Sequence, residues 1–188
     1  MAWMGGLLTE GNGGGRGNRL DRGRRGGQRG GMPIPTLYLD TSAIGGYFDA
    51  EWMRGTRELW RLMELGIYRF VTSTVTLEEI IPAPERVREL FDASFPAEAI
   101  LPATDETDRL ALAYLRQGIL PEKCLADAQH VAICTVAGLE YLVSWNFKHL
   151  VNAERKKGFN GINLLHGYRN VSIVSPWEFI YDDRNQTT

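Results

Sequence analysis

The stretch Thr36-Leu-Tyr-Leu-Asp40 is an apolar run that ends in a carboxylate. Apolar residues on both faces are typical of a central strand in a parallel sheet. Four later runs predict further strands, at 68–72, 99–101, 141–144 and 171–174. Helical patterns lie between them, at 52–65, 74–81, 85–93, 104–117 and 122–137, with a last helical turn from 176. This alternation predicts an α/β fold with three layers, α/β/α, around a central and mostly parallel sheet.

The composition indicates one globular domain behind a basic extension. Of the 188 residues, 44% are hydrophobic and 23% are charged, which is ordinary for a globular protein. Residues 1–32 are rich in Gly and Arg and have almost nothing to bury, so we expect disorder there. We expect the domain to span 33–182 and a short tail to span 183–188. Residues 1–31 carry a charge of +4 within a net charge of −2, so the remainder carries −6, which argues against a large basic surface.

The two cysteines, Cys124 and Cys134, are ten residues apart. This pattern predicts neither a disulfide framework nor the paired spacing of a zinc site, so we expect two reduced and mostly buried thiols. No run approaches the roughly 20 apolar residues of a membrane helix. The first residues have no basic segment of the kind that opens a signal peptide. We therefore expect a cytoplasmic protein with no membrane partner.

Four acidic or amide residues stand where predicted strands end or predicted helices begin: Asp40, Glu79, Asp127 and Asn146. Ligands of parallel sheets bind at the carboxyl ends of the strands, and we expect these side chains to meet there. Carboxylate, carbonyl and water oxygens are the ligands that Mg²⁺ and Mn²⁺ prefer. The sequence therefore predicts a metal site that is suited to phosphate chemistry.

The four residues belong to four short motifs that resemble those of PIN-domain nucleases. The motifs are Leu37-Tyr-Leu-Asp40-Thr-Ser42, Ser73-Thr-Val-Thr76-Leu-Glu-Glu79-Ile, Ala126-Asp127-Ala-Gln-His-Val-Ala and Ser144-Trp-Asn146-Phe. The resemblance covers roughly residues 35–180. The last motif is similar to the corresponding motif in a bacterial branch of the family, the VapC-like toxins. It implies a PIN-like fold and a metal-dependent ribonuclease. It also implies an antitoxin protein that holds the enzyme inactive, and a homodimer, for which the exposed-looking Trp52 and Trp60 are weak support.

The resemblance also implies roles for the site residues. Asp40, Glu79 and Asp127 would bind one firm Mg²⁺ or Mn²⁺ ion, and a second ion would arrive with the substrate. Asn146 would complete the catalytic set, although the commoner family pattern has an acid there; its amide oxygen could still hold a metal-bound water. Two purely structural interpretations stay open, namely Asp40 as the cap of the following turn and Asp127 as a first-turn acid that the helix dipole favours.

Weaker candidates surround this set. Ser42 could orient Asp40 or bind a water on the metal, and Ser144 could assist Asn146. Arg54, Arg57 and Arg61 form a stripe at helical spacing that could bind RNA phosphates, and Lys148 and His149 could do the same after the fourth motif. An ordinary solvated helix face explains the basic residues equally well. His130 and His149 are expected to pack or to form hydrogen bonds rather than to catalyse.

Two functions remain open from the sequence. The first is an endoribonuclease, as the toxin of a toxin-antitoxin pair, that hydrolyses RNA phosphodiester bonds. The second is a catalytically weak PIN-like module that binds RNA or protein, which the uncharged Asn146 motivates. Two other enzymes with an aspartate at a strand end are disfavoured, because a haloacid-dehalogenase phosphatase needs an Asp where Ser42 stands, and a receiver domain needs an acidic pair after its first strand.

Overall fold

The computed structural model describes residues 33–183, and their side chains as far as residue 180. The expected Gly/Arg-rich extension at 1–32 and the tail beyond residue 183 lie outside the described residues. The boundaries predicted for the domain, 33 and 182, stay a prediction.

A five-stranded sheet forms the centre of the described chain. The strands are β1 (Thr36–Leu39), β2 (Arg69–Ser73), β3 (Ile100–Leu101), β4 (Tyr141–Val143) and β5 (Ser172–Val174). Their spatial order is β3-β2-β1-β4-β5, and each of the four pairings is parallel. After β1 the chain adds β2 and β3 on one side of this strand, and it later adds β4 and β5 on the other side. The carboxyl ends of β1 and β4 therefore flank the switch point of the sheet, where ligands of such folds bind.

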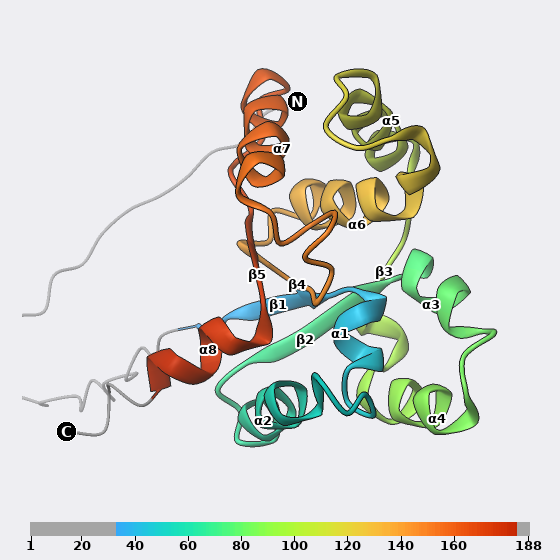
Figure 1. The fold of residues 1–188 in the computed structure, drawn as a ribbon, viewed down its shortest axis with the longest axis vertical. Helices are drawn as coiled ribbons and strands as arrows, with labels where there is room; N and C mark the ends of the chain where they lie inside the picture. Colours follow the sequence, from blue (N-terminus) through green and yellow to red (C-terminus); the bar gives the residue numbers. More distant parts are fainter. Residues whose placement is uncertain (1–32, 184–188) are drawn as a thin grey trace, which may run out of the picture. The chain divides into compact units, whose positions relative to one another are not determined.

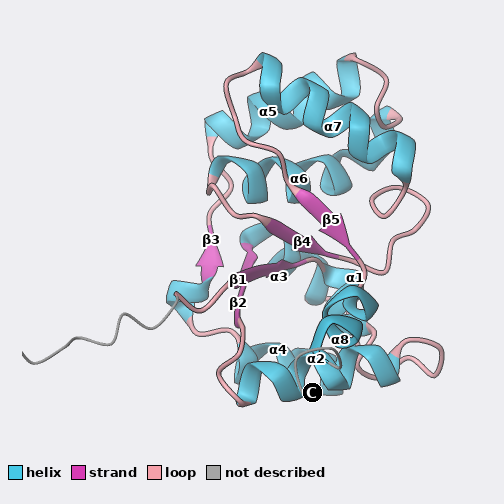
Figure 2. Cartoon of the chain, turned by 90° about the vertical axis from the view of Figure 1, so that its left-hand side faces the viewer, coloured by secondary structure: helices cyan, strands magenta, loops and turns pink. Residues whose placement is uncertain are grey.

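Helices cover both faces of the sheet, which confirms the predicted three-layer α/β/α fold (Figures 1 and 2). Three helices pack on one face: α5 (Asp105–Arg116), α6 (Leu125–Val136) and α7 (Ala153–Leu165). Four pack on the opposite face: α1 (Thr41–Gly45), α2 (Met53–Glu64), α4 (Glu85–Ser94) and α8 (Pro176–Asp183). The short helix α3 (Thr74–Ile80) follows β2 and contacts both α1 and α6. It therefore lies at the carboxyl edge, between the two layers.

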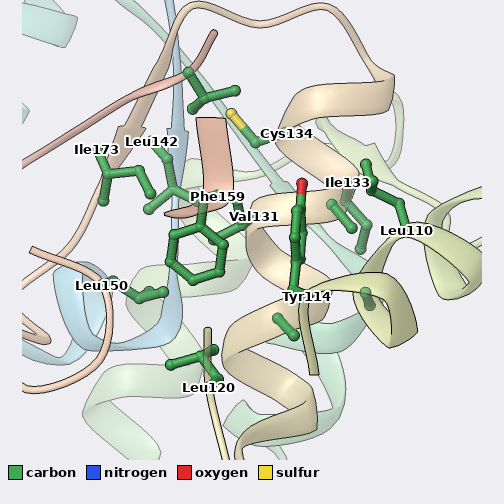
Figure 3. Close-up of a cluster of buried hydrophobic side chains, with 14 of the residues drawn as sticks. Leu110, Tyr114, Leu120, Val131, Ile133, Cys134, Leu142, Leu150, Phe159 and Ile173 are labelled. Carbon is green, nitrogen blue, oxygen red and sulfur yellow. The ribbon is translucent and has the colours of Figure 1, made fainter. Parts of the chain in front are cut away.

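The two layers explain why β1 is apolar throughout. Tyr38 is fully buried in the core under α5, α6 and α7, whereas Leu37 and Leu39 are fully buried in the core under α1, α2, α4 and α8. Successive side chains of a strand point to opposite faces, so a central strand needs apolar residues at every position. Figure 3 shows part of the first core, where Leu142 and Ile173 of the sheet meet Phe159 of α7.

The structure differs from the sequence prediction in several details, among them helix α1, which was not predicted. The predicted helix at 122–137 is a 3₁₀ turn at Glu122–Cys124 followed by α6, because Cys124 has a non-helical backbone with φ −100° and ψ 38°. Helix α7 was not predicted, although Asn152 caps it by accepting a hydrogen bond from the backbone N–H of Arg155. Trp60 is not exposed: it is 4% accessible and its indole N–H donates to Ser94.

Among residues 33–183, no helix combines the length and the hydropathy that a membrane-spanning segment requires.

Candidate active site at the carboxyl edge of the sheet

Asp40 directly follows β1 and lies almost completely buried, with 3% of its surface exposed. Its Oδ1 accepts hydrogen bonds from the backbone N–H of Ala43 at 2.9 Å and from the hydroxyl of Ser42 at 2.8 Å. The expected orienting role of Ser42 and the capping role of Asp40 are thus both present in the geometry. Burial raises the pKa of Asp40, although nearby His130 and the Ser144 hydroxyl oppose this. A carboxylate in this position is costly unless a cation or strong hydrogen bonds accompany it.

The fourth motif is joined to the first across the switch point. Ser42 Oγ accepts a hydrogen bond from the backbone N–H of Trp145 at 2.9 Å and lies 3.2 Å from Ser144 Oγ. Trp145 is held in turn by its indole N–H, which donates to Thr56 at 2.8 Å, and by close packing on Gly46, where a Cβ would come within 2.6 Å of the ring. The strand ends of β1 and β4 are therefore fixed to each other by side chains of the motifs themselves.

Asn146 pairs with Asp127, nineteen residues earlier, at the start of α6. Its Nδ2 donates to Asp127 Oδ1 at 2.9 Å, and its Oδ1 accepts from the backbone N–H of His149 at 2.9 Å. One neighbour is an acceptor and the other a donor, so the orientation of the amide is unambiguous. The amide oxygen of Asn146 thus accepts one hydrogen bond from His149 and keeps a second lone pair, so its expected contact with a metal-bound water stays a prediction, while the amide nitrogen orients Asp127.

Glu79 lies on the last turn of α3, with 38% of its side chain exposed. The hydroxyl of Thr41 donates to Glu79 Oε2, and His130 Nε2 lies 3.1 Å from the same oxygen. Partial burial raises the pKa of Glu79, but these bonds from His130 and Thr41 outweigh it and leave the pKa below its ordinary value. Glu79 is therefore held as a carboxylate that faces both the first motif and α6. Its neighbour Glu78 is exposed.

His130 connects this carboxylate to the core. The ring is 3% exposed, and its Nδ1 lies 2.8 Å from the hydroxyl of Tyr38, which donates to Ser73 Oγ at 2.7 Å. Hydrogen bonds thus run without a break from Ser73 through Tyr38 and His130 to Glu79. Sequence reasoning expected His130 to form hydrogen bonds but did not place it in the site. The available signal was its position three residues after Asp127 on one helix face.

Burial and neighbouring groups act on the pKa of Asp127 in opposite directions. Burial raises the pKa of Asp127, His149 and His130 lower it, and the charge of Glu79 raises it further. Like charges that face each other in a partly buried site are relieved by a bound positive ion. The ligand atoms of Asp40, Glu79 and Asp127 are not, however, gathered within 4.8 Å of one another. In the described chain the group that meets this distance is Cys124, Asp127 and His149.

A groove opens beside the first motif. It has a volume of about 620 Å³ and is lined by Thr41, Ser42, Gly45, Gly46, Phe48, Asp49, Ala50, Trp52, Ile80, Ala83, Pro84, Arg86, Val87 and Trp145. The basic residue on this lining is Arg86, which sequence reasoning did not single out.

The arginine stripe predicted from the sequence does not line this groove. Arg57 donates to the backbone oxygen of Tyr47 at 3.1 Å, and Arg61 forms an ion pair with Glu58 at 2.6 Å. Arg54 is exposed on the same helix. Lys148 is exposed on the turn after the fourth motif, while the half-buried ring of His149 lies beside Cys124. The geometry thus assigns Arg57 and Arg61 local contacts of their own.

Comparison with known proteins yields matches only among solved structures. No protein-family model and no curated protein matches the chain. The crystal structure of FitAcB from Neisseria gonorrhoeae is similar at 14% identity and a TM-score of 0.49, over 75% of this chain and 98% of that one. That of VapBC2 from Rickettsia felis, bound to a DNA fragment from their promoter, is similar at 12% identity and a TM-score of 0.47, over 74% and 98%. Similarity at this level concerns the course of the backbone alone, so function rests on the chain's own side chains.

Proposed function

We propose that this chain is a metal-dependent endoribonuclease of the PIN-like class, which hydrolyses RNA phosphodiester bonds as the toxin of a toxin-antitoxin pair. The observation that carries the proposal is the meeting of four separate motifs around the switch point of the sheet. Ser42 bonds to Asp40 and Trp145, and Asn146 bonds to Asp127. Thr41, next to Asp40, bonds to Glu79. A purely structural use of these residues would not require acids of three motifs at one edge.

Asp40, Glu79 and Asp127 are the residues that would hold Mg²⁺ or Mn²⁺. Their ligand atoms are not all within 4.8 Å of one another, so waters would supply part of the coordination, as Mg²⁺ usually retains several. The oxygens of these residues are the hard donors that these ions prefer, and burial raises the pKa of two of the three carboxyls, Asp40 and Asp127. When bound, such an ion polarises a phosphodiester and lowers the pKa of a water. Because the three groups carry at most three negative charges, we propose one firm ion.

The remaining side chains hold the acids in place. Asn146 fixes one oxygen of Asp127, and Thr41 and His130 both contact Glu79 Oε2. Each carboxylate thus has a defined orientation before substrate arrives, which lowers the reorganisation that the reaction requires. The groove beside Ser42, with Arg86 on its wall, is the proposed path of the RNA backbone. The exposed Lys148 would add a second phosphate contact.

The direct test is cleavage of a mixed RNA pool by the full chain with Mn²⁺ and with EDTA. Asp40→Asn removes the charge but keeps a side chain that can cap α1, and Asp92→Asn, at an exposed acid of α4, is the matched control. We expect wild type and Asp92→Asn to cleave only with metal, and Asp40→Asn to lose at least about 10²-fold of the rate. Equal cleavage by Asp40→Asn would overturn the proposal.

The antitoxin is proposed as a partner whose extended or helical segment places a basic side chain near the acidic site. A homodimer is proposed on the same resemblance to VapC-like toxins. Light scattering of the purified chain, alone and after co-expression with a small neighbouring reading frame, tests both proposals. A monomer that forms no stable complex with that product would remove them.

A binding module is the second candidate, and the environment of Asn146 favours it specifically. At this position the chain has a neutral amide whose two ends are already engaged by Asp127 and His149. The site therefore has one charge fewer than the commoner pattern of the family to which we compare it. RNA binding by wild type with no turnover in Mn²⁺ would favour this candidate, whereas multiple turnover would remove it.

A further inference from the structure

A second group of metal-ligating side chains lies beside the carboxylates. Cys124, Asp127 and His149 each offer one ligand atom, and these atoms lie within 4.8 Å of one another. The sulfur of Cys124 is 3.8 Å from both ring nitrogens of His149. The sequence pattern predicted no zinc site, because the three ligands come from two segments with no paired spacing.

Local structure orients each of these ligands. Cys124 is the residue before α6 and Asp127 is the third residue of that helix, and the ligand atoms of the two lie within 4.8 Å of each other. His149 lies on the turn that its own backbone N–H forms with the side chain of Asn146. Because Asn146 also binds Asp127, a single amide positions two of the three ligands. Cys124 is 8% exposed, while Asp127 and His149 are half-buried, so an ion can enter from solvent.

The donor set identifies the class of ion. A thiolate, an imidazole and one carboxylate are ligands of Zn²⁺ and its analogue Co²⁺, whereas Mg²⁺ takes oxygen ligands. With Zn–ligand bonds of about 2.0–2.3 Å, tetrahedral ligands are roughly 3.5 Å apart. The separation of 3.8 Å between Cys124 and His149 is already close to this value.

We propose that Cys124, Asp127 and His149 form a binding site for a thiophilic divalent cation, Zn²⁺ in the first place. On binding, the thiol proton of Cys124 passes to solvent and the sulfur bonds to the metal, while solvent completes the fourth position. Because Asp127 is also a proposed ligand of the catalytic ion, the two ions compete for its carboxylate. That competition, unlike the site itself, rests on the proposed function.

Titration of the full chain with Co²⁺ tests the site without any measurement of activity. A bond between cobalt and a thiolate produces an intense charge-transfer absorption in the near ultraviolet. We expect wild type to develop this band with one equivalent of Co²⁺ and to lose it when Zn²⁺ is added. Cys124→Ser is expected to lack the band, and His149→Gln to bind Zn²⁺ at least about tenfold more weakly by calorimetry.

Two controls separate this site from the rest of the molecule. Cys134→Ala removes the other thiol, which is fully buried within α6, and should keep the band. Asp40→Asn removes a proposed ligand of the catalytic ion and should also keep the cobalt band. The test of this site is therefore independent of the result for RNA cleavage. Absence of the band in folded wild type, or its persistence in Cys124→Ser, would overturn the proposal.

Discussion

Two buried hydrogen-bond networks lie on the same face of the sheet and end differently. In the first, under α5, α6 and α7, the hydroxyl of Tyr114 donates to Asn163 Oδ1, and Asn163 Nδ2 donates to Thr135 at 3.2 Å. These three side chains are almost wholly buried, and the ring of Tyr114 lies among the apolar residues of the core (Figure 3). The network begins and ends inside the protein.

The second network starts equally deep but reaches the surface. It runs from Ser73 through Tyr38 and His130 to Glu79, whose side chain is 38% exposed. Burying polar groups costs free energy unless they are paired, and both networks meet that demand. Only the second delivers a carboxylate to the edge where β1 and β4 diverge. Burial and hydrogen bonding are common to both networks, so what supports the proposed role of Glu79 is that the second network ends at the carboxyl edge of the sheet.

The largest expected effect is on catalysis, at the exposed end of the second network. Glu79→Gln keeps a group that can accept from Thr41 and His130 but removes the charge. Loss of one group that stabilises charge in a reaction typically costs about 10²–10³-fold in rate. We expect this loss in Mn²⁺-dependent RNA cleavage, while Tm stays nearly constant because the side chain is partly exposed. A large fall in Tm with normal cleavage would show that Glu79 stabilises the fold and takes no part in catalysis.

Asn163→Ala removes the middle of the first network, which begins and ends inside the protein. It should reduce stability and leave catalysis unchanged. Tyr114 and Thr135 would each lose the hydrogen bond to Asn163 and keep only each other, with 3.5 Å between their hydroxyl oxygens. A buried polar group without a full partner costs about 1–3 kcal/mol. We expect a fall of about 2–3 kcal/mol in the free energy of unfolding, measured by urea denaturation. Cleavage per folded molecule should be unchanged, because the side chains that bond to Asn163, Tyr114 and Thr135, belong to none of the four motifs. A variant that is stable but inactive would contradict the distinction between the networks.

Tyr38→Phe tests the second network in its middle and should have intermediate effects. The hydroxyl of Tyr38 contacts both Ser73 and His130, so its removal leaves two polar groups without this partner. We expect about 1–2 kcal/mol of destabilisation and a decrease in kcat of at most about tenfold, because His130 is no longer held toward Glu79. Michaelis-Menten kinetics of RNA cleavage, with KM little changed, check this. If Tyr38→Phe is less stable but has the kcat of wild type, the hydroxyl of Tyr38 has no influence on Glu79 during the reaction.

The smallest effect concerns stability and pH at Asp40. Burial, the largest influence, raises the pKa of Asp40 above its ordinary value. The stabilising contribution of its protonated form is therefore lost as pH rises through the folded-state pKa, and a buried charge remains at neutral pH. In metal-free protein, Asp40→Asn should raise stability by about 1 kcal/mol, roughly 2–4 °C in Tm.

The same prediction has a pH signature. The difference in Tm between Asp40→Asn and wild type should shrink as pH falls from neutrality toward the ordinary carboxyl value of 3.8. Differential scanning calorimetry in EDTA across this range measures it. A variant that is less stable than wild type at neutral pH, or a difference that does not depend on pH, would contradict a raised pKa at Asp40.

The sequence predicted the layers and the strands because apolar runs and helical periodicity report burial directly. Tyr38 and Leu39 had to be apolar for a strand that is covered on both faces, and the four motif residues stood at strand or helix ends. Contacts between motifs were less accessible. The roles of Asn146 and His130 depend on partners nineteen and fifty-one residues away, and no local spacing encodes which end of an amide meets which partner.

The same reason explains two other failures of the sequence prediction. The grouping of Cys124 with His149 arises from the turn that Asn146 forms, which links two distant segments. Trp60 is buried because its ring packs in the core under α2 and α4, where its indole N–H also donates to Ser94. A helical pattern alone does not say which aromatic residues face inward. Tertiary contacts therefore decided each of these cases.

A calorimetric titration with Mn²⁺ shows directly whether the carboxylates at the switch point bind one hard divalent cation, as we propose. Wild type should bind one ion, Asp92→Asn should bind it equally well, and Asp40→Asn should bind it at least about tenfold more weakly. Affinity for Mn²⁺ that is the same in Asp40→Asn and in wild type would contradict the account.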